Sequence, residues 1–152
     1  IGYESLAEEL IKIPKLEAVF VGTSSGTTAQ AISEYFFRNG NKIEIHIVQT
    51  SSCHPISDNF VDHEIVDEQS IADAIVDHTA IRKDNLTELI IKTKGNAWVV
   101  SNEEIRTAQE ITKKYANLEI STNSALSVAG LMQAIYTSRS WNGSVACIIC
   151  GD

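Results

Sequence analysis

The sequence contains no long apolar run and no cluster of basic residues. None of its apolar stretches approaches the roughly 20 residues that a membrane-spanning helix requires, and its opening residues lack the basic-then-apolar pattern of a secretory signal. Its 12 lysines and arginines are scattered, with a single Lys-Lys pair at Lys113 and Lys114, and the formal net charge is −8. Because binding to a phosphate backbone needs a clustered basic face, we expect neither nucleic acid nor a membrane as a partner.

Cysteine is also rare, with Cys53, Cys147 and Cys150 as its only occurrences. An odd number without a disulfide framework favours a reducing compartment, and we expect a cytoplasmic protein. Cys147 and Cys150 have CxxC spacing, but they lie in the predicted strand SVACIIC, where an odd separation directs side chains to opposite faces. No second CxxC and no nearby histidine completes a zinc site. We therefore expect no metal.

The patterns that are present alternate between strand and helix along the whole chain. The 152 residues, 43% of them apolar and 21% charged, suit a single soluble domain. Strands are expected at residues 18–21, 43–48, 98–101 and 144–150. Helices are expected at residues 6–13, 27–38, 70–74, 84–94, 102–115 and 123–138. This alternation predicts one α/β domain over residues 1–152, a three-layer αβα sandwich with a mainly parallel, Rossmann-like sheet of about four strands.

The most informative segment is VFVGTSSGTTAQAI, residues 19–32, which reads as a buried strand, a turn of small residues and a helix. The free N–H groups at the start of a helix, together with the positive end of the helix dipole, favour an anion such as phosphate. Gly22 and Gly26 permit a tight turn, and five hydroxyl residues lie between positions 23 and 28. The same residues are typical of a plain turn with a helix cap. Spacing alone leaves both interpretations open.

Two common phosphate motifs do not fit this segment. No lysine follows the glycines, as a Walker A loop requires, and residues 22–27 read G-T-S-S-G-T instead of GxGxxG. Glu44 nevertheless lies on the next predicted strand, near the place of a ribose-binding acid. A non-catalytic nucleotide-binding or regulatory α/β domain is therefore an alternative, and so is an interaction domain whose loop holds no ligand.

Seven segments, taken in order, resemble the pyridoxal-phosphate enzymes of fold type II, the tryptophan synthase β-like superfamily. That group includes threonine synthase, threonine and serine dehydratases, and cysteine synthase. Its phosphate-binding glycine loop resembles GTSSGTTAQAI, the helix before that loop resembles GYESLAEEL, and the strand and loop after it resemble IEIHIVQTSSCHPI. The remaining landmarks match SIADAI, WVVSNEEIRTAQEI, NSALSVAGL and CIICGD. The resemblance covers essentially the whole chain.

This resemblance implies pyridoxal 5′-phosphate as the cofactor and a small amino acid as the substrate. It assigns the cofactor phosphate to the N–H groups and hydroxyls of Ser24, Ser25, Gly26, Thr27 and Thr28. It places Cys150 beside the pyridine nitrogen, where the family has Ser, Thr or Cys, and a neutral partner there leaves the nitrogen largely unprotonated. Asp152 is the other candidate partner, against the family pattern. Ser24 and Thr27 stand where the family often has glycine, and neither accepts a positive φ at low cost.

The chain lacks the lysine that forms a Schiff base with the cofactor in that family, within a motif far upstream of the glycine loop. Lys12 and Lys15, the only lysines before Gly22, flank Pro14 in no such motif. The resemblance therefore implies that residues 1–152 are the C-terminal part of a longer, homodimeric enzyme. That enzyme would be a threonine synthase- or dehydratase-like lyase or synthase, catalysing β- or γ-elimination or replacement. Without its N-terminal part, the chain is not expected to catalyse.

Overall fold

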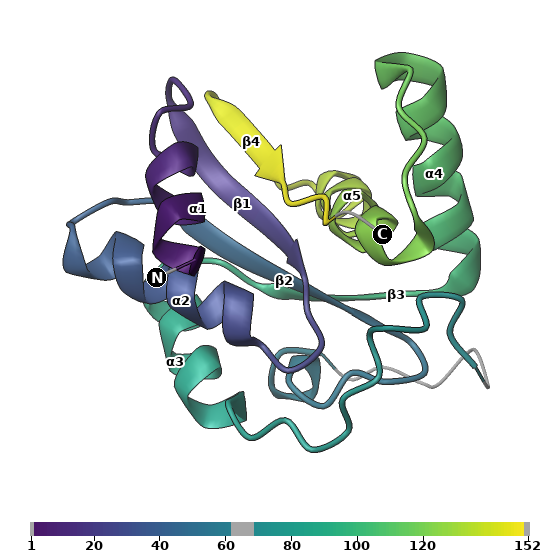
Figure 1. Ribbon diagram of the computed structural model, residues 1–152, viewed down its shortest axis with the longest axis horizontal. Coiled ribbons are helices and arrows are strands. Elements are labelled where there is room, and N and C mark those ends of the chain that lie inside the picture. Colours follow the sequence, from purple (N-terminus) through teal and green to yellow (C-terminus); the bar gives the residue numbers. More distant parts are fainter. Residues whose placement is uncertain (1, 62–68, 151–152) are drawn as a thin grey trace.

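Parallel strands form the middle layer of the computed structural model, which describes residues 2–61 and 69–150 (Figure 1). In chain order the strands of this part are β1 (Leu16–Gly22), β2 (Glu44–Thr50), β3 (Ala97–Val100) and β4 (Ser144–Cys147). Their order across the sheet is β3-β2-β1-β4, and every neighbouring pair is parallel. The central strand β1 is buried from residue 18 to residue 21. Both faces of such a strand are covered, which explains why AVFV is a continuous apolar run.

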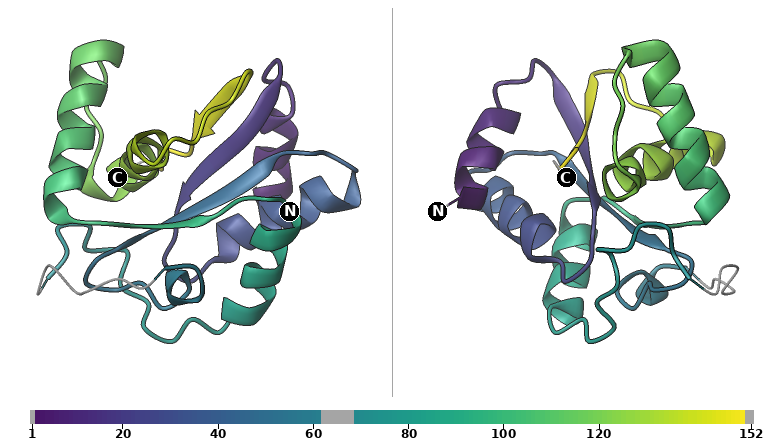
Figure 2. Two further views of the ribbon diagram at one scale, coloured as in Figure 1. Left: turned by 180° about the vertical axis from the view of Figure 1, so that it is seen from behind. Right: turned by 45° about the vertical axis from the view of Figure 1, so that its right-hand side comes forward.

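Helices cover both faces of the sheet (Figure 2). The described residues contain α1 (Gly2–Leu10), α2 (Thr27–Arg38), α3 (Lys83–Lys92), α4 (Asn102–Ala116), α5 (Thr122–Tyr136) and a 3₁₀ turn, η1 (Ser57–Asn59). On one face, Val19 and Val21 pack with buried residues of α1, α2 and α3. On the other face, Ala18 and Phe20 pack with buried residues of α4 and α5. The predicted fold class, an αβα sandwich around a parallel sheet of four strands, is confirmed.

Local signals located several helix boundaries. The helix α2 spans the predicted residues, and Gly40 beyond its end adopts a left-handed φ of 69°. Ser101 and Glu104, which have the S-x-x-E spacing typical of a helix start, form a capping box: the Ser101 hydroxyl accepts from the Glu104 N–H, and the Glu104 carboxylate accepts from the Ser101 N–H. Such boxes satisfy donors that the first turn of a helix leaves free. These boundaries depend on neighbouring residues, which is why the sequence predicts them.

The first helix was predicted wrongly at both ends. The helix α1 begins at Gly2 instead of residue 6, and it ends at Leu10 instead of residue 13. The N–H groups of Lys12 and Ile13 donate to carbonyls only three residues back, at 3.2 and 3.0 Å. The chain therefore tightens into a turn before Pro14, because the residue preceding a proline is disfavoured in the α conformation.

The helix predicted at residues 70–74 does not form. Ser70 is a residue type that favours helix starts, and its hydroxyl accepts from the N–H of Ala72 at 3.0 Å. Side chains at the starts of α4 and α5 then bind the backbone of this segment. The Asn102 amide accepts from the Ile71 N–H at 2.9 Å, and the Thr122 hydroxyl donates to the Ile71 carbonyl at 2.8 Å. Tertiary hydrogen bonds thus satisfy backbone groups that a helix would otherwise pair.

Candidate functional site

The glycine loop, residues 22–28, connects the carboxyl end of β1 to the start of α2. Its turn depends on Gly26, which has φ 87° and ψ 3°. A Cβ at this position would lie 2.8 Å from Cδ2 of Leu86, so both the backbone angle and the packing require glycine. Neither Ser24 nor Thr27 is among the described residues with positive φ. The two departures from the family pattern therefore introduce no backbone strain.

The loop presents a row of unused donors. None of the hydrogen bonds of the described residues uses the backbone N–H groups of residues 24 to 29. The row is bounded by Thr23, whose N–H donates to the Val48 carbonyl at 2.9 Å, and by Gln30, whose N–H donates to the Gly26 carbonyl at 2.9 Å. No side chain caps the start of α2. Donors that converge at the positive end of a helix dipole are the arrangement that binds phosphate groups.

The hydroxyls of the loop differ in whether their protons are already used within the protein. Thr23 is buried, and its hydroxyl donates to the Val21 carbonyl at 2.8 Å, so its proton is already used within the protein. Ser25 and Thr27 lie close to each other, with 3.0 Å between their hydroxyl oxygens. The Ser24 hydroxyl accepts from the Asp77 N–H at 3.2 Å, which leaves its own proton available to a ligand.

These groups surround a hollow of about 220 Å³ at the carboxyl edge of the sheet. It is lined by all five predicted phosphate-binding residues, together with Gly22, Thr23, Ala29, Tyr3 and Ile75. Pockets that hold a whole small ligand measure about 300–1,000 Å³, so the hollow suits one end of a ligand. No lysine or arginine lines it among the described residues. A phosphate bound there would be held by N–H and O–H donors, and the residues present fit that group.

Cys150, the sixth predicted site residue, does not line this hollow. It is exposed, and its carbonyl accepts a hydrogen bond from the Ser124 hydroxyl at the start of α5. The same helix start packs against the loop, since a Cβ on Gly22 would lie 3.4 Å from the Asn123 carbonyl oxygen. Cys150 and the hollow thus lie on the same edge of the sheet, next to the same helix start. Asp152 lies outside the described residues.

The two cysteines of the CxxC motif have different surroundings. The Cys147 thiol donates to the Ser127 carbonyl at 3.6 Å, and burial raises the pKa of this thiol to about 12. The strand predicted at residues 144–150 ends at Cys147, so Cys150 lies beyond β4 and the alternation of side chains along a strand does not decide its direction. Cys150 is exposed, whereas the Cys147 thiol is largely buried. Among the described residues, no cluster of three His, Cys, Asp or Glu side chains is placed to hold a metal ion.

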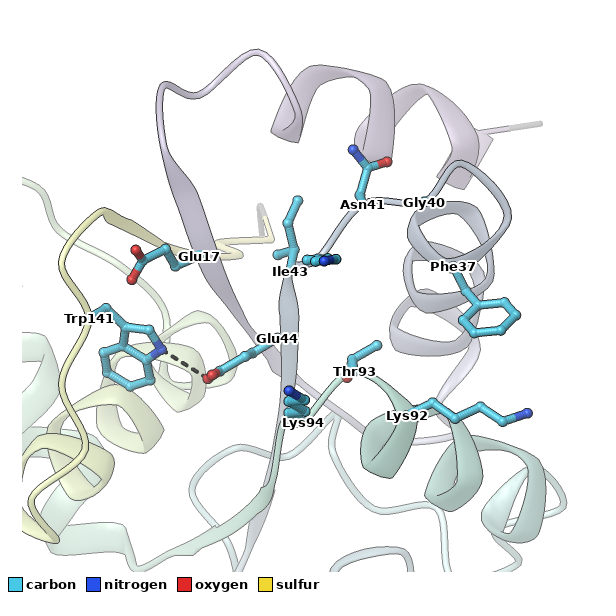
Figure 3. Close-up of a pocket in the computed structure, with 11 residues that line it drawn as sticks. Glu17, Phe37, Gly40, Asn41, Ile43, Glu44, Lys92, Thr93, Lys94 and Trp141 are labelled. Carbon is cyan, nitrogen blue, oxygen red and sulfur yellow. Dashed lines mark hydrogen bonds between the residues drawn. The ribbon is translucent and has the colours of Figure 1, made fainter.

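A larger hollow, of about 640 Å³, lies at the opposite edge of the sheet, where the strands begin (Figure 3). Its lining combines the apolar side chains Phe37, Ile43 and Trp141 with three lysines. The lysines lie at or just beyond the C-terminal ends of α2 and α3, where a positive charge offsets the negative end of the helix dipole. Ligands of open parallel sheets bind at the carboxyl edge instead. We therefore assign no ligand to this larger hollow.

Glu44 belongs to this amino edge, which excludes it as a ribose-binding acid. It is the first residue of β2, whereas Gly22, which precedes the glycine turn, pairs with Val48 further along the same strand. One Glu44 carboxylate oxygen accepts from Nε1 of Trp141 at 2.9 Å (Figure 3). The same oxygen accepts from Nη1 of Arg139 at 3.1 Å. The carboxylate is occupied by structural contacts, and the nucleotide interpretation loses the residue that favoured it.

His46 completes a buried cluster beside Glu44. Its ring is 0% exposed and stacks on Phe20 with 4.4 Å between the ring centroids. Trp98 Nε1 can only donate, and it lies 3.1 Å from His46 Nδ1, so Nδ1 is the acceptor and Nε2 carries the proton. Nε2 then donates to the Glu44 carboxylate at 2.9 Å. The neutral ring is therefore bound at both nitrogens and acts as a packing residue.

Because of this burial, we expect His46 to make stability depend on pH. Burial lowers the pKa of His46 from 6.5 to about 4; Arg139 adds to the lowering, and Glu44 opposes it. Below pH 6.5 the histidine of the unfolded chain binds a proton, whereas His46 of the folded chain stays neutral down to about pH 4. The free energy of unfolding therefore falls as the pH falls from 6.5 to about 4. The total decrease due to His46 is about 3 kcal/mol. Chemical denaturation of wild type and His46→Phe between pH 4 and 7.5 measures this decrease. The free energy of unfolding of wild type should fall towards low pH relative to that of His46→Phe. A pH-independent difference between the two free energies would contradict the assignment.

Fold and site together define a class of protein. A parallel sheet with helices on both faces, and with amides at the carboxyl end of a central strand that the described residues leave unpaired, is the arrangement in which α/β domains commonly bind anionic ligands. The chain belongs to the family of pyridoxal-phosphate dependent enzymes, whose model matches residues 1–151. Pyridoxal phosphate is the cofactor of this family. No helix of the described residues is long and apolar enough to cross a membrane.

Solved structures with the same fold include several amino-acid enzymes. A threonine deaminase from T.th. superimposes with a TM-score of 0.76 and 12% identity, over 99% of this chain and 56% of its own. For an L-serine ammonia-lyase from Rhizomucor miehei the TM-score is 0.74 and the identity 12%, over 99% of this chain and 51% of the lyase. For a serine racemase from Dictyostelium discoideum the TM-score is 0.72 and the identity 16%, over 99% of this chain and 48% of the racemase. The chain spans about half the length of these structures. No curated protein sequence matches it.

Proposed function

We propose that this chain is the cofactor-phosphate-binding portion of a pyridoxal-phosphate lyase or synthase acting on a small amino acid. The reaction would be a β- or γ-elimination or replacement of the threonine dehydratase or threonine synthase kind. One observation carries the proposal: the unpaired N–H groups of residues 24–29 line a hollow that no other part of the described chain fills. The names of the structural neighbours, which refer to threonine and serine, support a small amino acid.

In this proposal the chain's own residues bind and orient. The N–H groups of Ser24, Ser25, Gly26, Thr27 and Thr28 donate to phosphate oxygens, and the hydroxyls of this loop add further donors. Gly26 allows the backbone to approach the ligand closely. The Cys150 thiol provides a neutral group at the pyridine nitrogen. When bound, pyridoxal phosphate supplies an electron sink for negative charge at the α-carbon of the substrate.

The lysine of the family would come from outside this chain. None of the chain's lysines lines the hollow at the glycine loop, and the chain spans about half the length of its structural neighbours. We infer that residues 1–152 are the C-terminal part of a longer enzyme that is a homodimer when intact. Its three free cysteines support a reducing, cytoplasmic environment.

The phosphate requirement is tested by calorimetric titration with pyridoxine 5′-phosphate and with pyridoxine. Neither compound has an aldehyde, so neither reacts with surface lysines, and they differ only in the phosphate. We expect the phosphorylated compound to bind at least about tenfold more tightly, since a charge-assisted hydrogen bond contributes about 1.5–3 kcal/mol. Equal affinities would contradict a phosphate site. Tight binding of ATP or NAD, with no binding of pyridoxine 5′-phosphate, would favour the regulatory nucleotide-binding domain.

A further inference from the structure

Tyr3 lines the hollow although it belongs to neither the glycine loop nor α2. The other lining residue from outside these segments is Ile75, whose side chain is apolar. Tyr3 therefore contributes the one polar side chain that reaches the hollow from another part of the described chain. Tyr3 is 43% exposed, and none of the hydrogen bonds of the described residues uses its hydroxyl. A phenol hydroxyl can donate one hydrogen bond, and this one is available.

The position of Tyr3 is set by the packing of α1 on α2. Ala7 and Leu10 of α1 are buried in the same cluster as Ala29, Ile32 and Phe36 of α2. The exposed ion pair between Glu4 of α1 and Arg38 of α2, at 2.6 Å, also joins the two helices. Exposed ion pairs contribute little, so the buried apolar contact is the main attachment. Tyr3, one turn before Ala7 on α1, is thereby brought to the hollow at the start of α2. The contact joins residues more than 20 positions apart in the sequence.

We propose that the Tyr3 hydroxyl donates a hydrogen bond to an oxygen of the phosphate group bound at the glycine loop. This inference rests on the proposed function and adds to it a ligand contact from α1. The N–H groups of residues 24–29 approach the hollow from the loop and from α2. A phosphate ester has three terminal oxygens, and no lysine or arginine lines the hollow among the described residues. A further neutral donor is therefore valuable, because hydrogen bonds to charged oxygens are stronger than those between neutral groups.

The competing explanation is that the ring of Tyr3 only covers the hollow. Removal of the hydroxyl alone separates the two, because phenylalanine keeps the ring and its contacts. The test uses wild type, Tyr3→Phe and a matched control, Tyr136→Phe, whose residue is 90% exposed at the end of α5 and does not line the hollow. Each protein is titrated calorimetrically with inorganic phosphate and with pyridoxine 5′-phosphate, and thermal melting is recorded for each.

We expect Tyr3→Phe to weaken the binding of both compounds by about three- to tenfold, the effect of losing one hydrogen bond. Tyr136→Phe should bind like wild type, and all three proteins should melt alike. Equal affinity of Tyr3→Phe and wild type would overturn this inference and leave the proposed function standing. A loss shared by Tyr136→Phe, or one accompanied by a lower melting temperature, would also overturn it. If wild type binds neither compound, the proposed function fails together with the inference.

Discussion

Replacing Ser25 by Asp is expected to weaken phosphate binding about 100-fold or more while leaving the fold intact. The Ser25 hydroxyl lies 3.0 Å from that of Thr27, within the hollow and next to the unpaired N–H groups at the start of α2. A carboxylate there would take the place of the ligand. Two such charges about 5 Å apart repel by about 3 kcal/mol or more at an effective dielectric constant near 20, so affinity should fall about 100-fold or more.

The same change should not destabilise the protein. A carboxylate before the first turn of a helix accepts hydrogen bonds from free N–H groups and interacts favourably with the dipole, which contributes about 0.3–1 kcal/mol. Ser25→Asp is therefore expected to unfold at an equal or higher denaturant concentration than wild type. Affinity and stability move in opposite directions only if the same donors serve both the carboxylate and the ligand.

The matched control is Ser25→Asn, which has nearly the same shape as Asp and no charge. Titration with pyridoxine 5′-phosphate should show a much smaller loss for Asn than for Asp. The site would be misassigned if both variants bound like wild type. Equal loss in both variants would attribute the effect to shape and not to charge.

Gly95→Ala is expected to destabilise the fold strongly. A Cβ at Gly95 would lie 1.7 Å from the carbonyl oxygen and 2.6 Å from the carbonyl carbon of Ile45. Ile45 belongs to β2 and pairs with Val19 of β1, so it has no freedom to move away. The N–H of Gly95 also donates to the Ile90 carbonyl at 3.0 Å, which holds the turn between α3 and β3 in place. We expect a loss of at least about 3 kcal/mol.

Urea denaturation followed by far-UV circular dichroism measures this loss. The control is Gly2→Ala, where a Cβ would meet no atom within 4 Å and where alanine favours the helix α1. This variant should be as stable as wild type or slightly more stable. A Gly95→Ala protein within about 1 kcal/mol of wild type, on the scale of a surface substitution, would show that the α3–β3 turn can move away from β2.

Short-range signals account for most of what could be predicted. The bounds of α2 and the capping box of Ser101 and Glu104 depend on residues within four positions of one another. The strand-turn-helix at residues 19–32 located the hollow, because in a parallel sheet the N–H groups after a strand necessarily lie at its carboxyl edge. The family resemblance is confirmed by the match over residues 1–151. Its assignment of a phosphate to Ser24 through Thr28 and of the pyridine nitrogen to Cys150 stays a prediction.

Three features could not be read from spacing. Glu44 looked like a nucleotide-binding acid until its position at the first residue of β2 placed it at the far edge of the sheet. The segment after Ser70 has a helix-start signal, yet side chains of Asn102 and Thr122 bind its backbone and prevent the helix. Tyr3 carries no motif and reaches the hollow only because α1 packs on α2.

The order of strands and helices, the glycine turn and the family therefore follow from the chain as written, since each depends on the conformational preferences of adjacent residues. Which donors stay free, which acid lies near the ligand and which helix supplies an extra hydroxyl depend on contacts between residues far apart in the sequence. Those contacts form when apolar surfaces are buried against one another. The free energy of burial depends on the apolar area removed from water and not on how far apart the residues are in the sequence.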